Sequence, residues 1–402
     1  MNRPGQRQLV ALQIAAAVIA LAFSSVPTAS APEGGFAPRG ASRELKGASG
    51  IYEWTFDSTR GPSPFDRIAL HRIARGPTPP KHPEIVVLYL PGTNMNGEVG
   101  VEDPRFSLPV YLATRGIDVW TLNYRTHFIP PDTPIEKLGE LRNWTNDLFV
   151  GDINAAAKFV TAITDRRKLF VAGFSRGAAF AYMFAADNPD ATAGLIILDG
   201  FISERPMPGY DSSKIADDLG GRQLTFAKRK KLLEMVIANP DGPAPIPQFK
   251  TARENLIHVI ERPGALGGAK GLANPSGGFS DPVVLAKLLI TYDRWWPAVQ
   301  NSEKSSKYRA GAVGEAKIPV IAFASTNIYR DWSLLVAASA VDTGSRDVTR
   351  VVLQDWGHLD VIAGAKSEKQ VFAPLVDWLR RHREVGQKLT PDWTDGVEPL
   401  RP

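Results

Sequence analysis

The sequence contains no cysteine, which excludes disulfides, thiol nucleophiles, cysteine-ligated metals and a lipid anchor on an N-terminal cysteine. It also lacks a Gly-x-Gly-x-x-Gly turn opening a βαβ unit, a Walker loop and a His-Glu-x-x-His pair. Those motifs mark dinucleotide, nucleoside-triphosphate and zinc-protease sites. We therefore expect neither a cofactor nor a metal.

A strong excess of one charge is absent as well. The 402 residues carry a formal net charge of +5, and the densest basic run is KRKK at 228–231. No aromatic residues alternate with this run, and it lies in a stretch with helical spacing. We interpret it as the solvated face of a helix and expect no nucleic-acid partner.

The chain has no apolar run of the roughly 20 residues that a membrane span needs. A shorter run, Leu9 to Phe23, follows Arg3 and Arg7 and precedes a stretch of small residues. This is the pattern of a secretory signal, which we predict over residues 1–31. The expected location is periplasmic or secreted. An uncleaved signal anchor, which would bring the chain to a membrane, is the alternative.

Apolar runs alternate with helical patterns over residues 50–200 and again over 316–386. Such alternation predicts right-handed βαβ crossovers and an α/β fold with a mainly parallel sheet flanked by helices. Two early runs, at 51–58 and 65–75, are expected to pair with each other. The remaining expected strands cover 84–92, 117–125, 168–174, 193–200, 318–325 and 348–356.

The alternation stops between residues 201 and 315. That stretch holds helix-like pieces separated by connectors rich in proline and glycine, and no clear strand. The last piece, VVLAKLLITYDRWW, reads as a helix up to its two tryptophans. We interpret 201–315 as a helical cap inserted into the sheet domain, and 387–402 as an irregular tail.

The most informative short motif is Gly173-Phe174-Ser175-Arg176-Gly177. An apolar strand precedes it and a helix of small residues follows. A serine at such a junction occupies a strained backbone conformation, and the flanking glycines avoid collisions there. The helix N-terminus also places partial positive charge where an oxyanion would form. We predict that Ser175 is a nucleophile.

With this motif, residues 50–200 and 315–385 resemble the α/β-hydrolase superfamily, in particular its esterases and lipases. The resemblance implies a nucleophile, an acid and a histidine in that chain order. His358 follows the last expected strand in the sequence GHLD, where such a histidine belongs. We interpret His382 as a solvated helix residue. His127 follows another strand, and we interpret it as a residue that can line the pocket.

The acid is less well defined by the sequence. In most relatives it follows the strand at 318–325, where this chain has Asn327, which is uncharged. Asp331 lies four residues further on. Asp199, which ends the strand after the nucleophile helix, keeps the expected order. We favour Asp199 and keep Asp331 as the alternative.

The oxyanion hole of this fold uses two backbone N–H groups. One belongs to the residue after the nucleophile, Arg176. The other follows the third strand, where relatives often have His-Gly and this chain has Pro91-Gly92. We expect the N–H of Thr93 to be this second donor, with Asn94 as the alternative.

Together these residues predict a serine hydrolase that cleaves carboxylic esters through an acyl-enzyme on Ser175. The expected partner is a small ester, and the apolar cap helices favour an apolar acyl part. Two other functions remain open. An acyltransferase would use the same nucleophile, and a catalytically silent hydrolase fold would only bind, a reading that the uncharged Asn327 supports.

Overall fold

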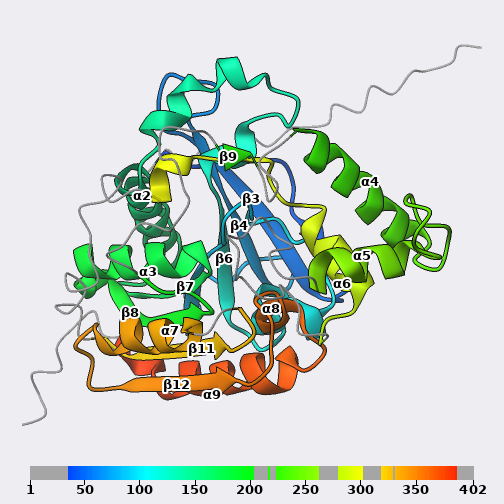
Figure 1. Ribbon diagram of the computed structural model, residues 1–402. Coiled ribbons are helices and arrows are strands. Elements are labelled where there is room, and N and C mark those ends of the chain that lie inside the picture. The colour runs from blue at the N-terminus through cyan, green and yellow to red at the C-terminus, as the bar shows by residue number, and fades with distance from the viewer. Residues whose placement is uncertain are drawn as a thin grey trace, which may run out of the picture. The chain divides into compact units, whose positions relative to one another are not determined.

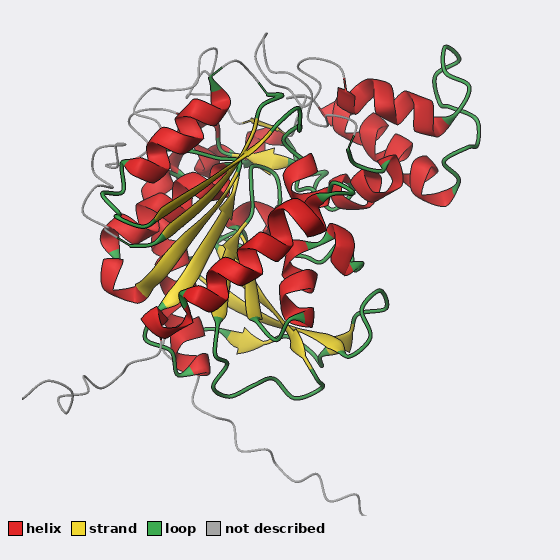
Figure 2. Ribbon diagram, turned by 90° about the horizontal axis from the view of Figure 1, so that it is seen from below, coloured by secondary structure: helices red, strands yellow, loops and turns green. Residues whose placement is uncertain are grey.

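A twisted sheet of ten strands organises the part of the chain that the structure describes (Figures 1 and 2). The computed structural model describes residues 35–202, 216–217, 223–261, 279–301, 318–328 and 331–386. The predicted signal at 1–31 and the predicted tail at 387–402 lie outside these ranges. No helix within them has the length and apolar character needed to cross a bilayer.

The sheet has the strand order β1-β3-β4-β6-β5-β7-β8-β11-β12, with β2 paired to β3. From β6 to β12 the neighbours are parallel, and β1 to β4 form an antiparallel extension in which β4 pairs with β6. The early pairing and the mainly parallel sheet match the sequence predictions. The strands are β1 (Ala37–Pro38), β2 (Arg43–Glu44), β3 (Ile51–Thr59), β4 (Arg67–Arg75), β5 (Val86–Leu90), β6 (Asp118–Asn123), β7 (Leu169–Phe174), β8 (Thr192–Leu198), β11 (Val320–Ser325) and β12 (Val348–Leu353).

Helices cover both faces of the sheet, which explains why β5, β7 and β8 consist almost entirely of buried apolar residues. One apolar cluster joins one face of the sheet to α2 (Asn146–Thr164), α3 (Arg176–Asp187) and α7 (Trp332–Val341). A second cluster joins the other face to α1 (Leu108–Thr114), α8 (Asp360–Ala363), α9 (Ala373–Arg381) and three helices from the stretch between β8 and β11.

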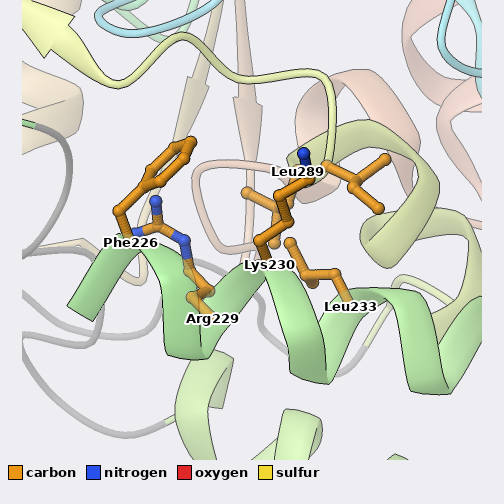
Figure 3. A pocket seen from close by; sticks show the side chains of 6 residues that line it. Phe226, Arg229, Lys230, Leu233 and Leu289 are labelled. Atoms are coloured by element: carbon orange, nitrogen blue, oxygen red, sulfur yellow. The ribbon is translucent and has the colours of Figure 1, made fainter. Parts of the chain in front are cut away.

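Those three helices are α4 (Gln223–Ala238), α5 (Ala252–Glu261) and α6 (Pro282–Leu289), and they pack against one another (Figure 1). Leu233 on α4 and Leu289 on α6 are buried at their junction, where a small pocket is also lined by Phe226, Arg229 and Lys230 (Figure 3). The basic run is therefore only partly a solvated face.

The end of this insertion differs from the sequence prediction. The helix α6 stops at Leu289, and the chain passes through a turn to the strand β10 (Trp295–Trp296), which pairs antiparallel with β9 (Ala216–Asp217). The prediction of a helix up to the tryptophans, without a strand, is wrong. Both tryptophan side chains are buried, so packing against the sheet domain overrides the helical spacing.

Candidate active site

Ser175 lies at the sharp turn between β7 and α3. Its backbone has φ 56° and ψ −120°, a region that a residue with a side chain rarely adopts. The Ser175 amide donates a hydrogen bond of 3.0 Å to the carbonyl of Leu198 at the end of β8. The neighbouring strand therefore fixes the turn that presents the serine.

Two glycines of the motif are required by close backbone approach. A Cβ on Gly177 would overlap the carbonyl oxygen of Leu90 at the end of β5, and a Cβ on Gly173 would overlap the carbonyl of Gly177. Backbone atoms cannot yield as a flexible side chain would. The glycines let β5, β7 and the start of α3 converge beneath Ser175, as the sequence motif predicts.

Asp199 follows β8 and is completely buried. Four hydrogen bonds end on its carboxylate. The backbone N–H of Ser325 (2.6 Å) and the indole Nε1 of Trp332 (3.0 Å) donate to Oδ1, and the Ser325 hydroxyl (2.7 Å) and His358 Nδ1 (2.6 Å) donate to Oδ2. Both oxygens of this buried carboxylate are therefore hydrogen-bonded, and its orientation is fixed.

His358 lies between β12 and α8, held from three sides. Its Nδ1 faces Asp199, its ring stacks on Phe174 with centroids 4.6 Å apart, and Trp332 meets it edge-on at 5.5 Å. Because a carboxylate only accepts, Nδ1 carries the proton and Nε2 is left with its lone pair. Phe174 directly precedes Ser175, so this imidazole lies beside the serine turn.

The loop that carries His358 is fastened by Asp360. This buried carboxylate accepts from the Gly357 amide at 2.8 Å and from the hydroxyl of Ser280, on the insertion side, at 2.6 Å. Phe279 stacks on Trp356 at 5.4 Å, beside the same loop. The insertion therefore contacts the histidine loop directly.

The alternative acid lies elsewhere. Asp331 is exposed at the start of α7, and its side chain makes no capping hydrogen bond there. Asn327 donates its backbone N–H to the carbonyl of Trp356 at 3.0 Å. Of the candidate acids, the structure brings Asp199 to His358.

The loop after β5 holds the expected second oxyanion donor. Gly92 accepts a hydrogen bond of 3.1 Å from Met95, which turns the chain at Thr93, and Asn94 has the left-handed φ of 61°. None of the hydrogen bonds found among the described residues uses the Thr93 amide. The hydroxyl of Tyr124 donates to the carbonyl of Pro91 at 3.0 Å and so fixes the start of this loop.

His127 lies between two carboxylates, with Nδ1 2.9 Å from Asp293 and Nε2 3.5 Å from Glu98. Burial alone would lower the pKa of His127, but hydrogen bonds to Asp293 and Glu98 raise it to about 10. With a pKa of about 10, this partly buried side chain is a cation at neutral pH. His382, expected to be solvated, instead bonds Asp347 at 2.8 Å and the carbonyl of Trp378.

Sequence reasoning missed the residues that orient the candidate acid. Ser325 ends β11 and Trp332 begins α7, so both are distant from Asp199 in the chain. Tryptophan and serine are common in cores and turns, and no spacing rule marks them. The sequence also gives no sign of the ion pair between His127 and Asp293, because it joins the sheet domain to the segment after α6.

Comparison with solved structures identifies the fold. A candidate lipase from Sulfolobus solfataricus superposes with a TM-score of 0.69 at 24% identity, covering 86% of this chain and 99% of that one. The chain has the α/β-hydrolase fold. A monoacylglycerol lipase from Paleococcus ferrophilus is more distant, with a TM-score of 0.45 at 14% identity, covering 75% of this chain and 96% of that one.

Sequence comparison finds similarity to a named protein over a limited segment of the chain. A probable lipase of Schizosaccharomyces pombe is 29% identical over 150 residues, which is 36% of this chain and 34% of that protein. The matched segment therefore spans about a third of that relative. No family model matches the sequence.

Proposed function

We propose that this α/β-hydrolase is a serine hydrolase that cleaves carboxylic esters, with Ser175 as nucleophile, His358 as base and Asp199 as acid. One observation carries the proposal. A fully buried carboxylate lies 2.6 Å from Nδ1 of an imidazole that stacks on the residue preceding a strained serine. The lipase names among the similar proteins favour esters as the substrate class.

The chemistry would proceed in two halves. Ser175 Oγ attacks the acyl carbon while His358 Nε2 takes its proton, and the imidazolium is stabilised by Asp199. Collapse of the tetrahedral intermediate releases the alcohol, which receives that proton. Water, activated by the same imidazole, then hydrolyses the acyl-enzyme and restores Ser175. The N–H groups of Thr93 and Arg176 would stabilise the oxyanion in both halves.

Phe279, in the insertion, stacks on Trp356 beside the loop of His358, and this apolar surface supports an ester with an apolar acyl part as substrate. We further propose that the chain is exported, on the basis of its N-terminal sequence. N-terminal sequencing of the protein recovered from an exporting cell tests the export proposal independently of activity, because it shows whether residues 1–31 have been removed.

The first test is labelling of the purified protein with a fluorophosphonate probe, with the modified residue mapped by mass spectrometry. We expect phosphonylation of Ser175 and none in Ser175→Ala. A panel of p-nitrophenyl esters of increasing chain length then measures hydrolysis, and added alcohols reveal transfer if new esters form. A folded protein that neither labels nor hydrolyses any ester would refute the proposed function.

A further inference from the structure

The segment at residues 291–296, which we call the strap, follows α6 within the insertion and runs along the loop after β5. Asn94 both donates hydrogen bonds to the strap and accepts one from it. The Asn94 side-chain amide donates to the carbonyls of Asp293 (3.0 Å) and Arg294 (3.1 Å), and the Asp293 amide donates to the Asn94 carbonyl at 2.7 Å. Asn94 is therefore held by backbone groups of the strap.

The side chain of Asp293 adds a second set of bonds. Its Oδ1 accepts from His127 Nδ1 at 2.9 Å and from the Asn96 side-chain amide at 3.0 Å. The Asn96 amide also donates to the carbonyl of Thr291 at 2.6 Å. One buried carboxylate thus joins the strap, the loop after β5 and the loop after β6.

Both ends of the same loop are fixed as well. Trp296 of the strap meets the ring of Tyr124 edge-on at 5.8 Å, and the Tyr124 hydroxyl donates to the carbonyl of Pro91. At the far end, the Gly97 amide donates to the Asn123 side chain at 2.6 Å. Thr93 lies between these anchors.

We propose that Asp293 is a positioning residue: its backbone holds Asn94, its side chain holds Asn96 and His127, and together these bonds set the orientation of the Thr93 amide in the oxyanion hole. This inference rests on the proposed function. Asp293 lies in the strap and bonds to His127 and Asn96. Its role in catalysis would therefore be indirect, through the loop that carries Thr93.

The bond between Asp293 and His127 is an ion pair. Among the described residues, the charged groups that face His127 are Asp293 and Glu98. The charges of His71 and Arg39 in turn lower the pKa of Glu98. The ring of Phe128, which is uncharged, packs edge-on against His127 with the ring centroids 5.4 Å apart. Loss of either charge weakens the binding of the His127 cation. Asp293→Asn also weakens the bond from Asn96, because a hydrogen bond to an ionised acceptor is about twice as strong as a neutral one.

The test compares Asp293→Asn with Asp347→Asn. Asp347 also binds a histidine, His382, at 2.8 Å, but on the surface and away from the site, so it is a matched control. The readouts are kcat and KM for a chromogenic ester and the rate of fluorophosphonate labelling. Removing one oxyanion donor outright lowers kcat by about 10²–10³-fold. We expect a misoriented donor in Asp293→Asn to lower kcat about 10- to 100-fold with KM nearly unchanged, and Asp347→Asn to match the wild type.

The pH profile supplies a readout that a purely structural role would not move. In Asp293→Asn, His127 keeps only Glu98 as an anionic partner, so its pKa falls. The remaining activity should therefore decline at lower pH on the alkaline side than in the wild type. If Asp293→Asn does not fold, Asn94→Gly replaces it, because glycine accepts the left-handed backbone and removes only the two side-chain bonds.

The outcomes are distinguishable. A wild-type protein that fails to label refutes the proposed function itself. A wild type that labels, with Asp293→Asn or Asn94→Gly labelling at the same rate, overturns the positioning role alone. A variant with a raised KM and an unchanged kcat overturns it too, because that result indicates contact with the substrate ground state.

Discussion

Replacement of Asp199 by asparagine should remove nearly all activity while the fold is retained. Asp199 has a φ of 51°, and asparagine is one of the few residues that tolerate this left-handed conformation. The substitution also preserves the side-chain shape. It therefore isolates the chemistry of the carboxylate better than Asp199→Ala, which would add backbone strain and a cavity.

The loss follows from the four donors around the carboxylate. If the new NH2 group took the Oδ1 position, it would face the Ser325 amide and the Trp332 indole, which can only donate. It therefore takes the Oδ2 position, where His358 can become an acceptor. The new side-chain amide then donates to His358 Nδ1, and the imidazole proton moves to Nε2.

An imidazole protonated on Nε2 cannot accept the proton of Ser175. The equivalent change in another serine hydrolase lowers kcat by about 10⁴-fold, or about 5.4 kcal/mol of transition-state stabilisation. We expect a loss of about 10³–10⁴-fold here, measured as kcat/KM on a p-nitrophenyl ester. Circular dichroism and thermal unfolding of the same sample establish that the variant is folded.

The matched control is Asp331→Asn, at the exposed alternative acid, which should retain activity within about threefold because surface changes away from a site are usually small. If Asp199→Asn kept more than a tenth of the wild-type kcat/KM, the assignment of the acid would be wrong. If Asp331→Asn alone lost activity, Asp331 would be the acid.

Three further predictions concern the surroundings of the site. Ser325→Ala removes one neutral donor from Asp199 and should lower kcat about five- to tenfold, about 1 kcal/mol, in the same ester assay. Gly177→Ala should lower the free energy of unfolding in urea by about 1–3 kcal/mol because its Cβ overlaps a backbone carbonyl. In contrast, Gly151→Ala, in open space on α2, should raise it by about 0.5–1 kcal/mol. His127 has a folded pKa of about 10, above its ordinary value of 6.5, so its stabilising contribution is complete below about pH 6.5 and is lost as the pH rises through 10. Urea unfolding at pH 7 and pH 11 should show this loss in the wild type and less of it in Asp293→Asn.

The elements around Ser175 could be predicted because each is specified locally. Continuous apolar runs mark strands that are buried on both faces, and the two glycines mark a turn where backbones converge. The position of His358 followed from chain order and from the strand before it. These signals lie within a few residues of the feature they indicate.

The strap and the support of Asp199 could not be predicted because they depend on contacts between distant segments. The apolar spacing of residues 283–296 is compatible with one helix. In the structure the helix ends at Leu289, and Trp296 belongs to a short strand, with its side chain buried against Tyr124. Similarly, α7 is apolar on most sides, so its sequence has no clear helical period, and Trp332 gives no sign of its partner.

The nucleophile and its candidate acid are set on adjoining strands by the register of β7 and β8, before the chain enters the insertion. Among the described residues, hydrogen bonds join the insertion to the site at Ser280 and along the strap. Substitutions on the exposed positions of α4 and α5 therefore change the surface of the insertion while the strand register keeps Ser175 and Asp199 in place.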